Sequence, residues 1–599
     1  MNIYNFKNLG GISDIYTIST DCGIYDGYDS VTKECENGFY AERKNFVVKS
    51  KVENERGVSV RCDTVENTSN DCLEIRHYAY RFCIETGEVE VYTQLNHWQN
   101  ESDGRWQDLV SGVTSMSKGA YTTSDATPMV AVWNKQTMRG IVFHIMPRHG
   151  WRIDVNKRNG VSGKIYTIIE ISVCDDALCI KADKGESIEF SPVLYYEFKD
   201  KTSLDCHKLH QYIYEKYPRK EMPVVYNSWL ATFDRIDFEL MLRQAEEAAK
   251  LGCEYFVIDA GWFGEGDKPW TDLIGMWEEN TTGALKGRMS DLSSLVHSLG
   301  MKFGIWLEPE RALKDVTSVK EHPEYFFSNG NSYFFDYSKA DARRYMLGVI
   351  NALVEKYNVD YIKLDFNDNI TYDVRREAFI YYHKGYFEFI NDIRRMFPDI
   401  YIEGCGGGGF RLDLDKVRLF DSYWFTDNQS PIKGSRILKN TILRIPPAFI
   451  DRWVSVISID GVTSAYSDKS ENRVISTDNG TWDYVAGVNP EFLKAFFSGG
   501  NIGLTCDLTK WDNNLKKEMS EFIAKYKKER EFWKNAICCV ICDTDSVMAL
   551  QYENCGEIKI VVYTYKINQA TLVIYPMNAE NPVVIDEPKD YYGYIISME

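Results

Sequence analysis

Strand-like and helix-like segments alternate through the middle of the chain, from Met222 to about Thr505. Short apolar runs, typical of buried parallel strands, are separated by longer segments whose apolar residues recur with helical spacing. The run Val224–Trp229 precedes an amphipathic segment, Phe238–Leu251, and Gly252 follows as a helix C-cap would. Further strand-like runs cover 255–259, 302–308, 361–367, 400–403, 422–425 and 501–505, and further helical patterns cover 292–299, 340–356 and 378–396.

This alternation predicts a central (β/α)8 TIM barrel, because about eight βα units over roughly 300 residues match that fold. We place the barrel domain at residues 221–534, with its last helix at 516–533. A doubly wound sheet is the alternative. We disfavour it because no glycine-rich phosphate loop follows the first strand.

The flanking parts of the chain have a different pattern. Residues 1–220 contain many short alternating segments separated by Gly, Asn and Asp, and they predict an N-terminal antiparallel β-sandwich domain. Residues 535–599 predict a small C-terminal β-sheet domain. Among the tryptophans of the N-terminal part, we expect most to lie in the core or at a domain interface, although one of their loops could reach the active site; they are Trp98, Trp106, Trp133 and Trp151.

Charge and cysteine content restrict the partners and the compartment. A net charge of −19 argues against nucleic acid and anionic membranes as partners. We find no run of 18 apolar residues and no signal peptide, and the odd count of 15 cysteines is typical of free thiols, so we expect a cytoplasmic protein. Cys538, Cys539 and Cys542 lie in an apolar strand-like run, and His207 and His210 have no acidic or cysteine partners nearby, so no metal site is expected.

The run from Tyr361 to Asn367 carries charge inside an apolar segment. Lys363 and Asp365 are two residues apart, so both side chains leave the same face of a strand. A nearby ammonium group would keep the carboxylate ionised, and an ionised carboxylate at the end of a barrel strand can act as a nucleophile. A structural ion pair between the two residues is the alternative, and this segment alone does not decide between them.

Nearly every predicted barrel strand ends in acidic or aromatic residues. In a barrel, the carboxyl ends of the strands meet at one mouth. Tryptophan rings stack on the apolar face of a sugar, carboxylates accept its hydroxyls, and glycoside hydrolysis needs two carboxyl groups across the scissile bond. The residues concerned are Trp229, Asp259, Trp262, Trp306, Glu308, Glu310, Lys363, Asp365, Glu403, Cys405, Asp427 and Asn428.

Seven motifs in this region resemble those of glycoside hydrolase family thirty-six, the α-galactosidase family of the melibiase clan. The motifs are Tyr-Asn-Ser-Trp at 226–229, Phe-Val-Ile-Asp-Ala-Gly-Trp-Phe-Gly at 256–264, Gly-Met-Lys-Phe-Gly-Ile-Trp-Leu-Glu-Pro-Glu at 300–310, Ile-Lys-Leu-Asp-Phe-Asn at 362–367, Glu-Gly-Cys-Gly-Gly-Gly-Gly-Phe-Arg-Leu-Asp at 403–413, Thr-Asp-Asn at 426–428 and Phe-Ser-Gly-Gly at 497–500. The resemblance implies an N-terminal β-supersandwich and a small C-terminal β-sandwich around the barrel.

The resemblance also implies a retaining α-galactosidase that acts on the terminal sugar and needs no cofactor. Asp365 matches the family's nucleophile, and Asp427 matches its general acid/base. The expected substrate is an oligosaccharide or another glycoside, and a homo-oligomer is left open. The residues expected to bind substrate are Trp229, Asp259, Trp262, Trp306, Lys363, Asn367, Cys405 and Gly408.

Several positions depart from the family pattern, and they concern recognition of the sugar. Ala260, Met276 and Gly330 replace two aspartates and an arginine, and Gly406 and Phe410 replace a serine and a glycine. An α-N-acetylgalactosaminidase or an α-galactosaminidase is therefore an alternative, as are activity on a pentopyranose or 6-deoxy sugar and galactosyl transfer. An alternative of another class is a non-catalytic carbohydrate-binding protein on the same fold.

Overall fold

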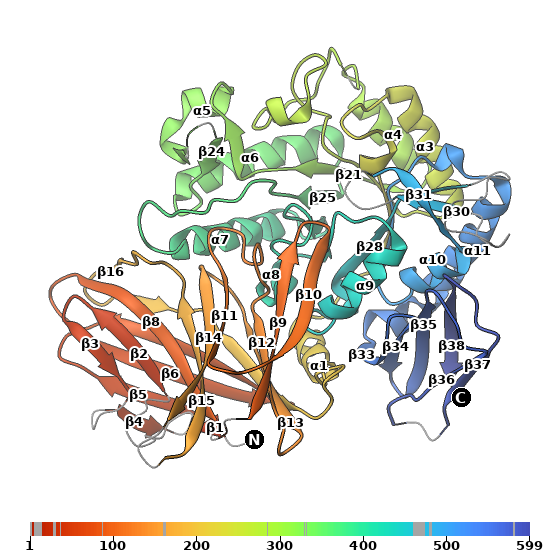
Figure 1. Ribbon diagram of the computed structural model, residues 1–599. Helices are drawn as coiled ribbons and strands as arrows, with labels where there is room; N and C mark the ends of the chain where they lie inside the picture. The colour runs from red at the N-terminus through yellow and green to blue at the C-terminus, as the bar shows by residue number, and fades with distance from the viewer. Residues whose placement is uncertain are drawn as a thin grey trace.

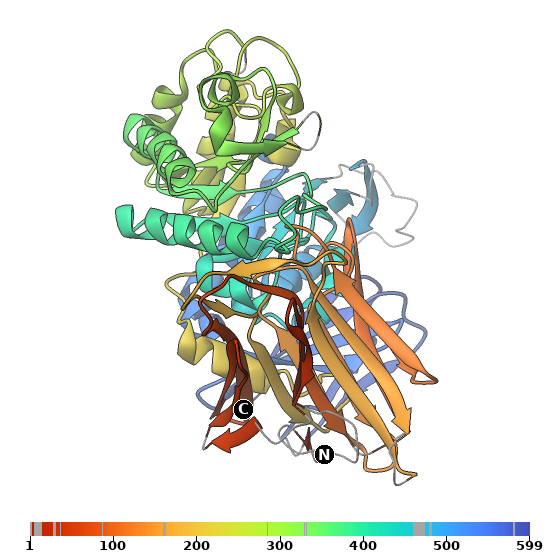
Figure 2. The same ribbon diagram turned by 90° about the vertical axis from the view of Figure 1, so that its left-hand side faces the viewer.

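The computed structural model describes residues 3–4, 15–27, 32–35, 37–84, 86, 88–159, 163–283, 285–328, 330, 332–458, 474–477, 482–578 and 581–598. Figure 1 shows an N-terminal β-sandwich in red to yellow, a central barrel in green and teal, and C-terminal sheets in dark blue. Figure 2 shows the sandwich beneath the barrel from a second side.

Eight strands form a closed parallel barrel, which confirms the predicted fold. Each strand pairs in parallel with both neighbours, and the last strand pairs with the first. The strands are β19 (Val224–Asn227), β20 (Tyr255–Ile258), β21 (Lys302–Leu307), β25 (Tyr361–Leu364), β26 (Tyr401–Gly404), β27 (Ser422–Trp424), β28 (Ile450–Val454) and β32 (Asn501–Leu504).

Helices cover the outside of the barrel. In α3, Asp237 accepts a hydrogen bond from the Leu240 backbone N–H, and Gly252 ends the helix at a φ of 94°, a left-handed conformation that favours glycine. The Gly252 cap is the one that the sequence pattern predicts. The helices along the barrel are α3 (Phe238–Leu251), α4 (Met289–Ser298), α6 (Ala340–Tyr357), α7 (Ile380–Met396), α8 (Leu414–Leu419), α9 (Pro431–Thr441), α10 (Pro490–Phe497) and α11 (Asn513–Lys534).

Strand β28 is absent from our sequence prediction, which names the other seven barrel strands. Its sequence, Ile-Asp-Arg-Trp-Val, carries two charged residues, although every residue of the strand is buried. The Arg452 guanidinium donates to the backbone oxygens of Phe496 and Ser498, and Asp451 accepts a hydrogen bond from Asn501. These contacts satisfy the buried polar groups of Asp451 and Arg452. A search for apolar runs misses this strand, because it takes charged residues as evidence against burial.

The N-terminal part forms two antiparallel sheets that pack face to face, with a shared core that includes Tyr16, Phe82, Val132 and Phe143. One sheet contains β1 (Ile3–Tyr4), β2 (Tyr16–Thr20), β3 (Gly23–Asp26), β8 (Leu73–Ile84), β11 (Gly112–Ser117), β14 (Trp151–Asn159), β15 (Ile165–Val173) and β16 (Ile180–Ala182). The other contains β4 (Thr32–Cys35), β5 (Gly38–Glu42), β6 (Phe46–Glu55), β7 (Val58–Asn67), β9 (Val89–His97), β10 (Asn100–Asp108), β12 (Met129–Asn134), β13 (Arg139–Ile145), β17 (Ser187–Glu189) and β18 (Val193–Phe198).

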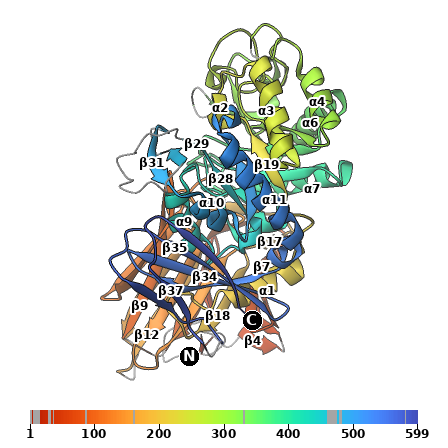
Figure 3. The same cartoon turned by 90° about the vertical axis from the view of Figure 1, so that its right-hand side faces the viewer.

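The C-terminal part forms a four-stranded and a two-stranded sheet around a small apolar core. These sheets lie below α10 and α11 (Figure 3), and the Tyr563 hydroxyl donates to the Ala495 backbone oxygen in α10. The strands are β33 (Ile537–Asp543), β34 (Val547–Asn554), β35 (Glu557–Thr564), β38 (Gly593–Met598), β36 (Thr571–Ile574) and β37 (Val583–Asp586). The domain boundaries at 220/221 and 534/535 stay predictions.

Three observations concern the described part of the chain as a whole. No helix in it is both long enough and apolar enough to cross a membrane. All fifteen cysteines are free thiols, and none of the described His, Cys, Asp and Glu side chains gather in a group of three or more that could hold a metal ion.

Candidate active site

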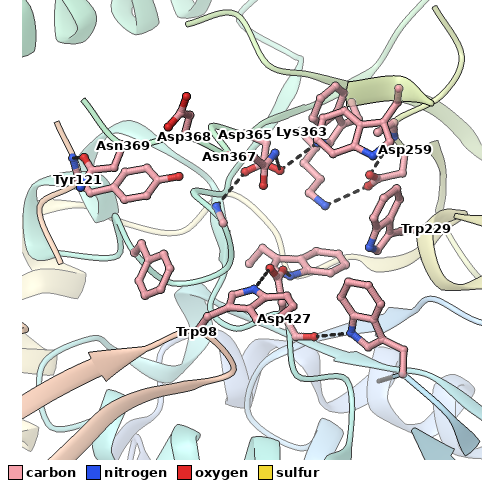
Figure 4. A pocket seen from close by; sticks show the side chains of 17 residues that line it. Trp98, Tyr121, Trp229, Asp259, Lys363, Asp365, Asn367, Asp368, Asn369 and Asp427 are labelled. Carbon is pink, nitrogen blue, oxygen red and sulfur yellow. Dashed lines mark hydrogen bonds and ion pairs between the residues drawn. The ribbon is translucent and has the colours of Figure 1, made fainter. Parts of the chain in front are cut away.

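A cavity of about 380 Å³ lies at the carboxyl ends of the barrel strands, and Figure 4 shows the side chains that line it. Both predicted catalytic residues and most of the predicted sugar-binding residues line this cavity. They are Trp229, Asp259, Trp306, Lys363, Asp365, Asn367 and Asp427. The barrel brings them together because each belongs to a parallel strand or to the loop directly after its carboxyl end.

The carboxylate of Asp365 lies directly after β25 and is held by donors on both oxygens. Oδ1 accepts from the backbone N–H groups of Phe366 at 2.8 Å and Gly407 at 3.3 Å. Oδ2 accepts from the indole N–H of Trp306 at 3.1 Å and from the Asn367 amide at 2.8 Å. An ionised carboxylate is an acceptor only, and four N–H donors suit that form. The four donors therefore fix the orientation of the Asp365 carboxyl, which lines the cavity.

Asp427 follows β27, and Figure 4 shows it on the side of the cavity that faces Asp365. The indole N–H groups of Trp98 and Trp424 donate to its two carboxyl oxygens, at 2.7 and 2.9 Å. Burial raises the pKa of Asp427 to about 6; the Trp98 hydrogen bond opposes this shift, and the negative charge of Asp365 adds to it. A carboxyl group with such a pKa can both give and take a proton near neutral pH.

Lys363 forms its ion pair with Asp259 rather than with Asp365, which corrects the pairing expected from the sequence. Its Nζ lies 2.9 Å from Asp259 Oδ2, and both side chains are almost fully buried. The ammonium group also lies 3.6 Å from the centre of the Trp424 ring. Asp259 accepts two further hydrogen bonds, from the Asn227 amide and from the Ala260 backbone N–H. The pair is therefore a rigid, charged wall of the cavity (Figure 4).

Glu308 lies behind Asp365 and contacts it through Asn367. It accepts a hydrogen bond from the Asn367 backbone N–H at 3.0 Å, and the Arg311 guanidinium lies 2.9 Å from the same carboxylate. Burial raises the pKa of Glu308 to about 7, against the effect of Arg311. Because the Asn367 amide donates to Asp365, Glu308 helps to orient the Asp365 carboxylate through Asn367 without lining the cavity.

Three predicted sugar-binding residues lie outside the cavity lining. Trp262 is fully buried, and its indole N–H donates to the Trp306 backbone oxygen. Cys405 is buried next to Trp424 in a core cluster. Gly408 has a φ of 80°, and a Cβ there would lie 2.8 Å from Glu101 Oε1 and 3.0 Å from the Asp427 backbone nitrogen. All three residues lie behind the cavity wall in this structure, and direct sugar contact by them stays a prediction.

Two of the acids predicted at strand ends also point away from the cavity. Glu310 binds the buried guanidinium of Arg411 through both oxygens. Glu403 accepts from the Trp453 indole N–H, and burial raises its pKa well above the ordinary value, with the charge of Asp451 adding to the shift. Side chains alternate in direction along each strand end, so a position near the mouth does not by itself place a residue in the cavity.

Sequence reasoning missed several lining residues, most of them aromatic or in long loops. Trp98 and Tyr121 come from the N-terminal sandwich, and the Tyr121 hydroxyl bonds the Phe366 backbone oxygen. Four tryptophans in this part were equivalent as candidates, and the alternating pattern around each of them gives no sign of which loop turns toward the barrel. The missed residues are Trp98, Tyr121, Trp270, Asp368, Asn369, Trp424 and Trp482.

The positions that depart from the family pattern do not all line the cavity. Ala260 and Phe410 do, and so does Gly407. Gly406 faces the Arg411 side chain instead, and neither Met276 nor exposed Gly330 belongs to the lining. An effect of Gly330 on sugar recognition therefore stays a prediction. The departing positions that line the cavity are thus Ala260 and Phe410, and Gly407 lies beside them in the lining.

Known proteins resemble this chain in sequence and in structure. A family model described as Melibiase matches residues 191–535. Alpha-galactosidase Mel36A of Lactobacillus acidophilus is 29% identical over 506 residues, which cover 80% of this chain and 65% of that protein. The bifunctional alpha-galactosidase/sucrose kinase AgaSK of Mediterraneibacter gnavus is 30% identical over 291 residues, 47% of this chain and 30% of that protein. The matched region thus spans less than two thirds of either relative.

Solved structures show the same fold over nearly the whole chain. The galactosidase domain of AgaSK has a TM-score of 0.82 at 20% identity and covers 99% of this chain and 88% of its own. The α-galactosidase AgaA of Geobacillus stearothermophilus, solved as a variant with raffinose, has a TM-score of 0.77 at 18% identity, with 97% of this chain and 88% of its own covered. Since the family model matches more than half of its residues, this chain belongs to the melibiase family of glycoside hydrolases.

Proposed function

We propose that this protein is a retaining α-galactosidase that removes a terminal α-linked galactose or a closely similar sugar. In the first step, an Asp365 oxygen bonds to the anomeric carbon, the glycosidic C–O bond breaks, and the Asp427 proton passes to the leaving oxygen. In the second step, Asp427 takes a proton from water, the water oxygen bonds to the anomeric carbon, and the bond to Asp365 breaks. The sugar leaves with its original anomeric configuration.

One observation carries this proposal: two carboxyl groups in opposite environments line one cavity. Asp365 is surrounded by four N–H donors and suits a permanent anion. Asp427 has two donors and a pKa raised to about 6, mainly by burial. The nucleophile of a retaining glycosidase must be charged, whereas its acid/base must change protonation between the two steps. The relatives named above, which carry α-galactosidase names, support the same assignment.

A second candidate is activity on an α-linked N-acetylgalactosaminide. Gly407 donates to the nucleophile, so the wall beside it lies next to the anomeric carbon and its ring neighbours, which include C2. Beyond Gly407, the cavity is lined by the rings of Tyr121 and Phe410, which lie 5.8 Å apart between centres. A side chain at position 407 would approach both rings, and its absence leaves apolar space that suits the methyl group of a 2-acetamido substituent.

Ala260 is expected to weaken activity on simple α-galactosides relative to a sugar that differs at C2 or C6. Its methyl group lines the cavity where the family has an aspartate, so one sugar hydroxyl lacks a charged acceptor. Such a hydrogen bond contributes about 1.5–3 kcal/mol, or roughly ten- to more than hundredfold in selectivity. Ala260→Asp is therefore expected to raise kcat/KM for nitrophenyl α-galactoside relative to the substrate that the native protein prefers.

The measurement is kcat/KM on a panel of nitrophenyl glycosides: α-galactoside, α-N-acetylgalactosaminide, α-galactosaminide and β-L-arabinopyranoside. Ala260→Ser is the matched control, since it adds a short polar group without a charge. If the native protein cleaves the α-galactoside fastest of the four, the specificity argument from Ala260 fails. Binding of the sugars without hydrolysis of any of them would favour the non-catalytic carbohydrate-binding alternative.

A further inference from the structure

The turn between β9 and β10 brings the N-terminal sandwich into contact with the acid/base loop of the barrel. Figure 1 shows this orange hairpin extending from the sandwich toward the teal part of the barrel. Trp98 at the turn donates its indole N–H to Asp427, and the Asn428 amide donates to the Gln99 backbone oxygen at 3.3 Å. Two neighbouring residues of the acid/base loop are thus bound by two neighbouring residues of the turn.

The hairpin is anchored so that the turn has a fixed position. The Gln94 amide donates to the Asn440 backbone oxygen in α9 at 2.8 Å. On the other strand, the Ser102 hydroxyl contacts the buried Arg444 guanidinium at 3.1 Å and the Thr441 hydroxyl at 3.2 Å. Because α9 follows the acid/base loop in the chain, these contacts fix the hairpin to the same segment of the barrel that carries Asp427.

Trp98 reaches Asp427 from the solvent side. Its side chain is 48% exposed, whereas its Nε1 lies only 2.7 Å from Asp427 Oδ2. Its ring packs edge-on against Trp482, at 5.8 Å between centres. Trp424 holds the other oxygen from within the barrel. Loss of the Trp98 hydrogen bond would therefore leave one oxygen of Asp427 without a protein donor, while the fold beneath it keeps its packing.

Besides Trp98, several charged or titratable groups lie around the Asp427 carboxyl. Asp365 and Lys363 face it across the cavity and act in opposite directions on its charge. Behind it, the Glu101 carboxyl is 2% exposed, and hydrogen bonding with Thr426 and the Gly409 backbone lowers its pKa against the effect of burial. Burial raises the pKa of Glu101 to about 8, and Cys405 is likewise held neutral by burial, which raises its pKa well above the ordinary value. Neither of these two groups is a fixed charge when Asp427 ionises.

We propose that Trp98 is a positioning residue for the hydrolysis, and that its indole N–H orients the Asp427 carboxyl and favours its ionised form. This inference rests on the proposed function, because it assumes that Asp427 is the acid/base. A donor stabilises a carboxylate more than it stabilises the neutral acid, so the N–H group holds down the pKa that burial raises. The N-terminal sandwich thereby contributes directly to the proton transfers of the reaction.

Trp98→Phe tests this proposal, because it removes the N–H group and keeps an aromatic ring against Trp482. With the best substrate of the panel, kcat/KM of the native protein is expected to fall above about pH 6, where Asp427 loses its proton. In the variant, this alkaline limb is expected to move up by about one pH unit, since the ionised form loses a stabilising donor. We also expect kcat to fall about tenfold, because the carboxyl is less well oriented.

Two controls separate a positioning role from a general loss of structure. Trp106 lies on the same hairpin, and its ring packs on Tyr92. The variant Trp106→Phe is expected to leave the pH profile unchanged. In the Asp427→Ala background, assayed with a nitrophenyl glycoside and azide, adding Trp98→Phe is expected to change the rate less than about twofold, because the group it acts on is gone.

The outcomes are distinct. An unchanged alkaline limb in Trp98→Phe, or an additive loss in the double variant, overturns this inference and leaves the proposed function in place. Near-native activity of Asp427→Ala itself overturns the proposed function, and with it the basis of the inference.

Discussion

Replacing Asp365 by Asn is expected to lower kcat by a factor of at least about a thousand, because the amide cannot form the covalent bond to the anomeric carbon. The substitution also changes the hydrogen bonding. Both oxygens of Asp365 face N–H donors, so an amide NH₂ group at either position meets other donors. We therefore expect a loss of about 1–3 kcal/mol in the free energy of unfolding. Steady-state kinetics, combined with thermal unfolding, measures both effects.

The matched control is Asp368→Asn. Asp368 lines the same cavity and carries the same charge, so its replacement removes one negative charge near the substrate without removing the nucleophile. This variant is expected to keep at least about a tenth of the native kcat. If Asp365→Asn retains near-native activity while its fold is intact, Asp365 is not the nucleophile.

Replacing Asp427 by Ala is expected to have the second-largest effect, and this effect can be partly reversed. The variant cannot protonate a poor leaving group, so turnover of an unactivated oligosaccharide should fall by about a hundredfold or more. With a nitrophenyl substrate, the first step needs little acid assistance. The second step is slow, because the variant has no base to activate water, so the covalent intermediate accumulates. Azide needs no base and fits the space that the carboxyl leaves, so it is expected to restore turnover. It attacks the β-linked glycosyl intermediate opposite Asp365 and is therefore expected to form an α-glycosyl azide.

Asp427→Asn tests whether rescue by azide depends on the space that the missing carboxyl leaves. It also lacks an acid/base, but it fills the volume of the carboxyl and can still contact the indole N–H groups of Trp98 and Trp424. Rescue by azide should therefore be weaker in Asp427→Asn than in Asp427→Ala. Product analysis by nuclear magnetic resonance distinguishes the anomers, and a β-glycosyl azide would contradict the placement of Asp427 opposite Asp365.

Most of the barrel could be predicted from the sequence because its strands are apolar and its helices are amphipathic. The runs that contain β20, β21, β25 and β27 are bounded by caps and turns, and the structure places each strand inside the predicted run. Strand β28 could not be found in this way, because Asp451 and Arg452 are buried through specific partners that lie far along the chain.

The residues of the candidate site could be predicted only where they lie at or near the end of a barrel strand. Asp259 and Asp365 come directly after strands, Asp427 lies three residues after β27, and the motifs around them identify the segments. The contact between Trp98 and Asp427 joins residues 329 positions apart, and no local pattern marks it. The Lys363 ion pair is a similar case, since its partner lies 104 positions away on another strand rather than two positions away on its own.

Several expectations are untested by this structure. The cytoplasmic location, the oligomeric state and the catalytic roles of individual residues stay predictions. The roles of Asp365 and Asp427 have the strongest physical support, because the environment of each carboxyl matches the protonation state that its role requires.

The central claim is a double displacement at the carboxyl groups of Asp365 and Asp427, and the anomer released first tests it most directly. The native protein is mixed with the panel substrate that it cleaves fastest, and proton nuclear magnetic resonance follows the anomeric signal of the free sugar before mutarotation. The account predicts that the anomer with the configuration of the substrate appears first and that the other anomer grows in later. Initial release of the opposite anomer would show a single displacement by water and would contradict the account.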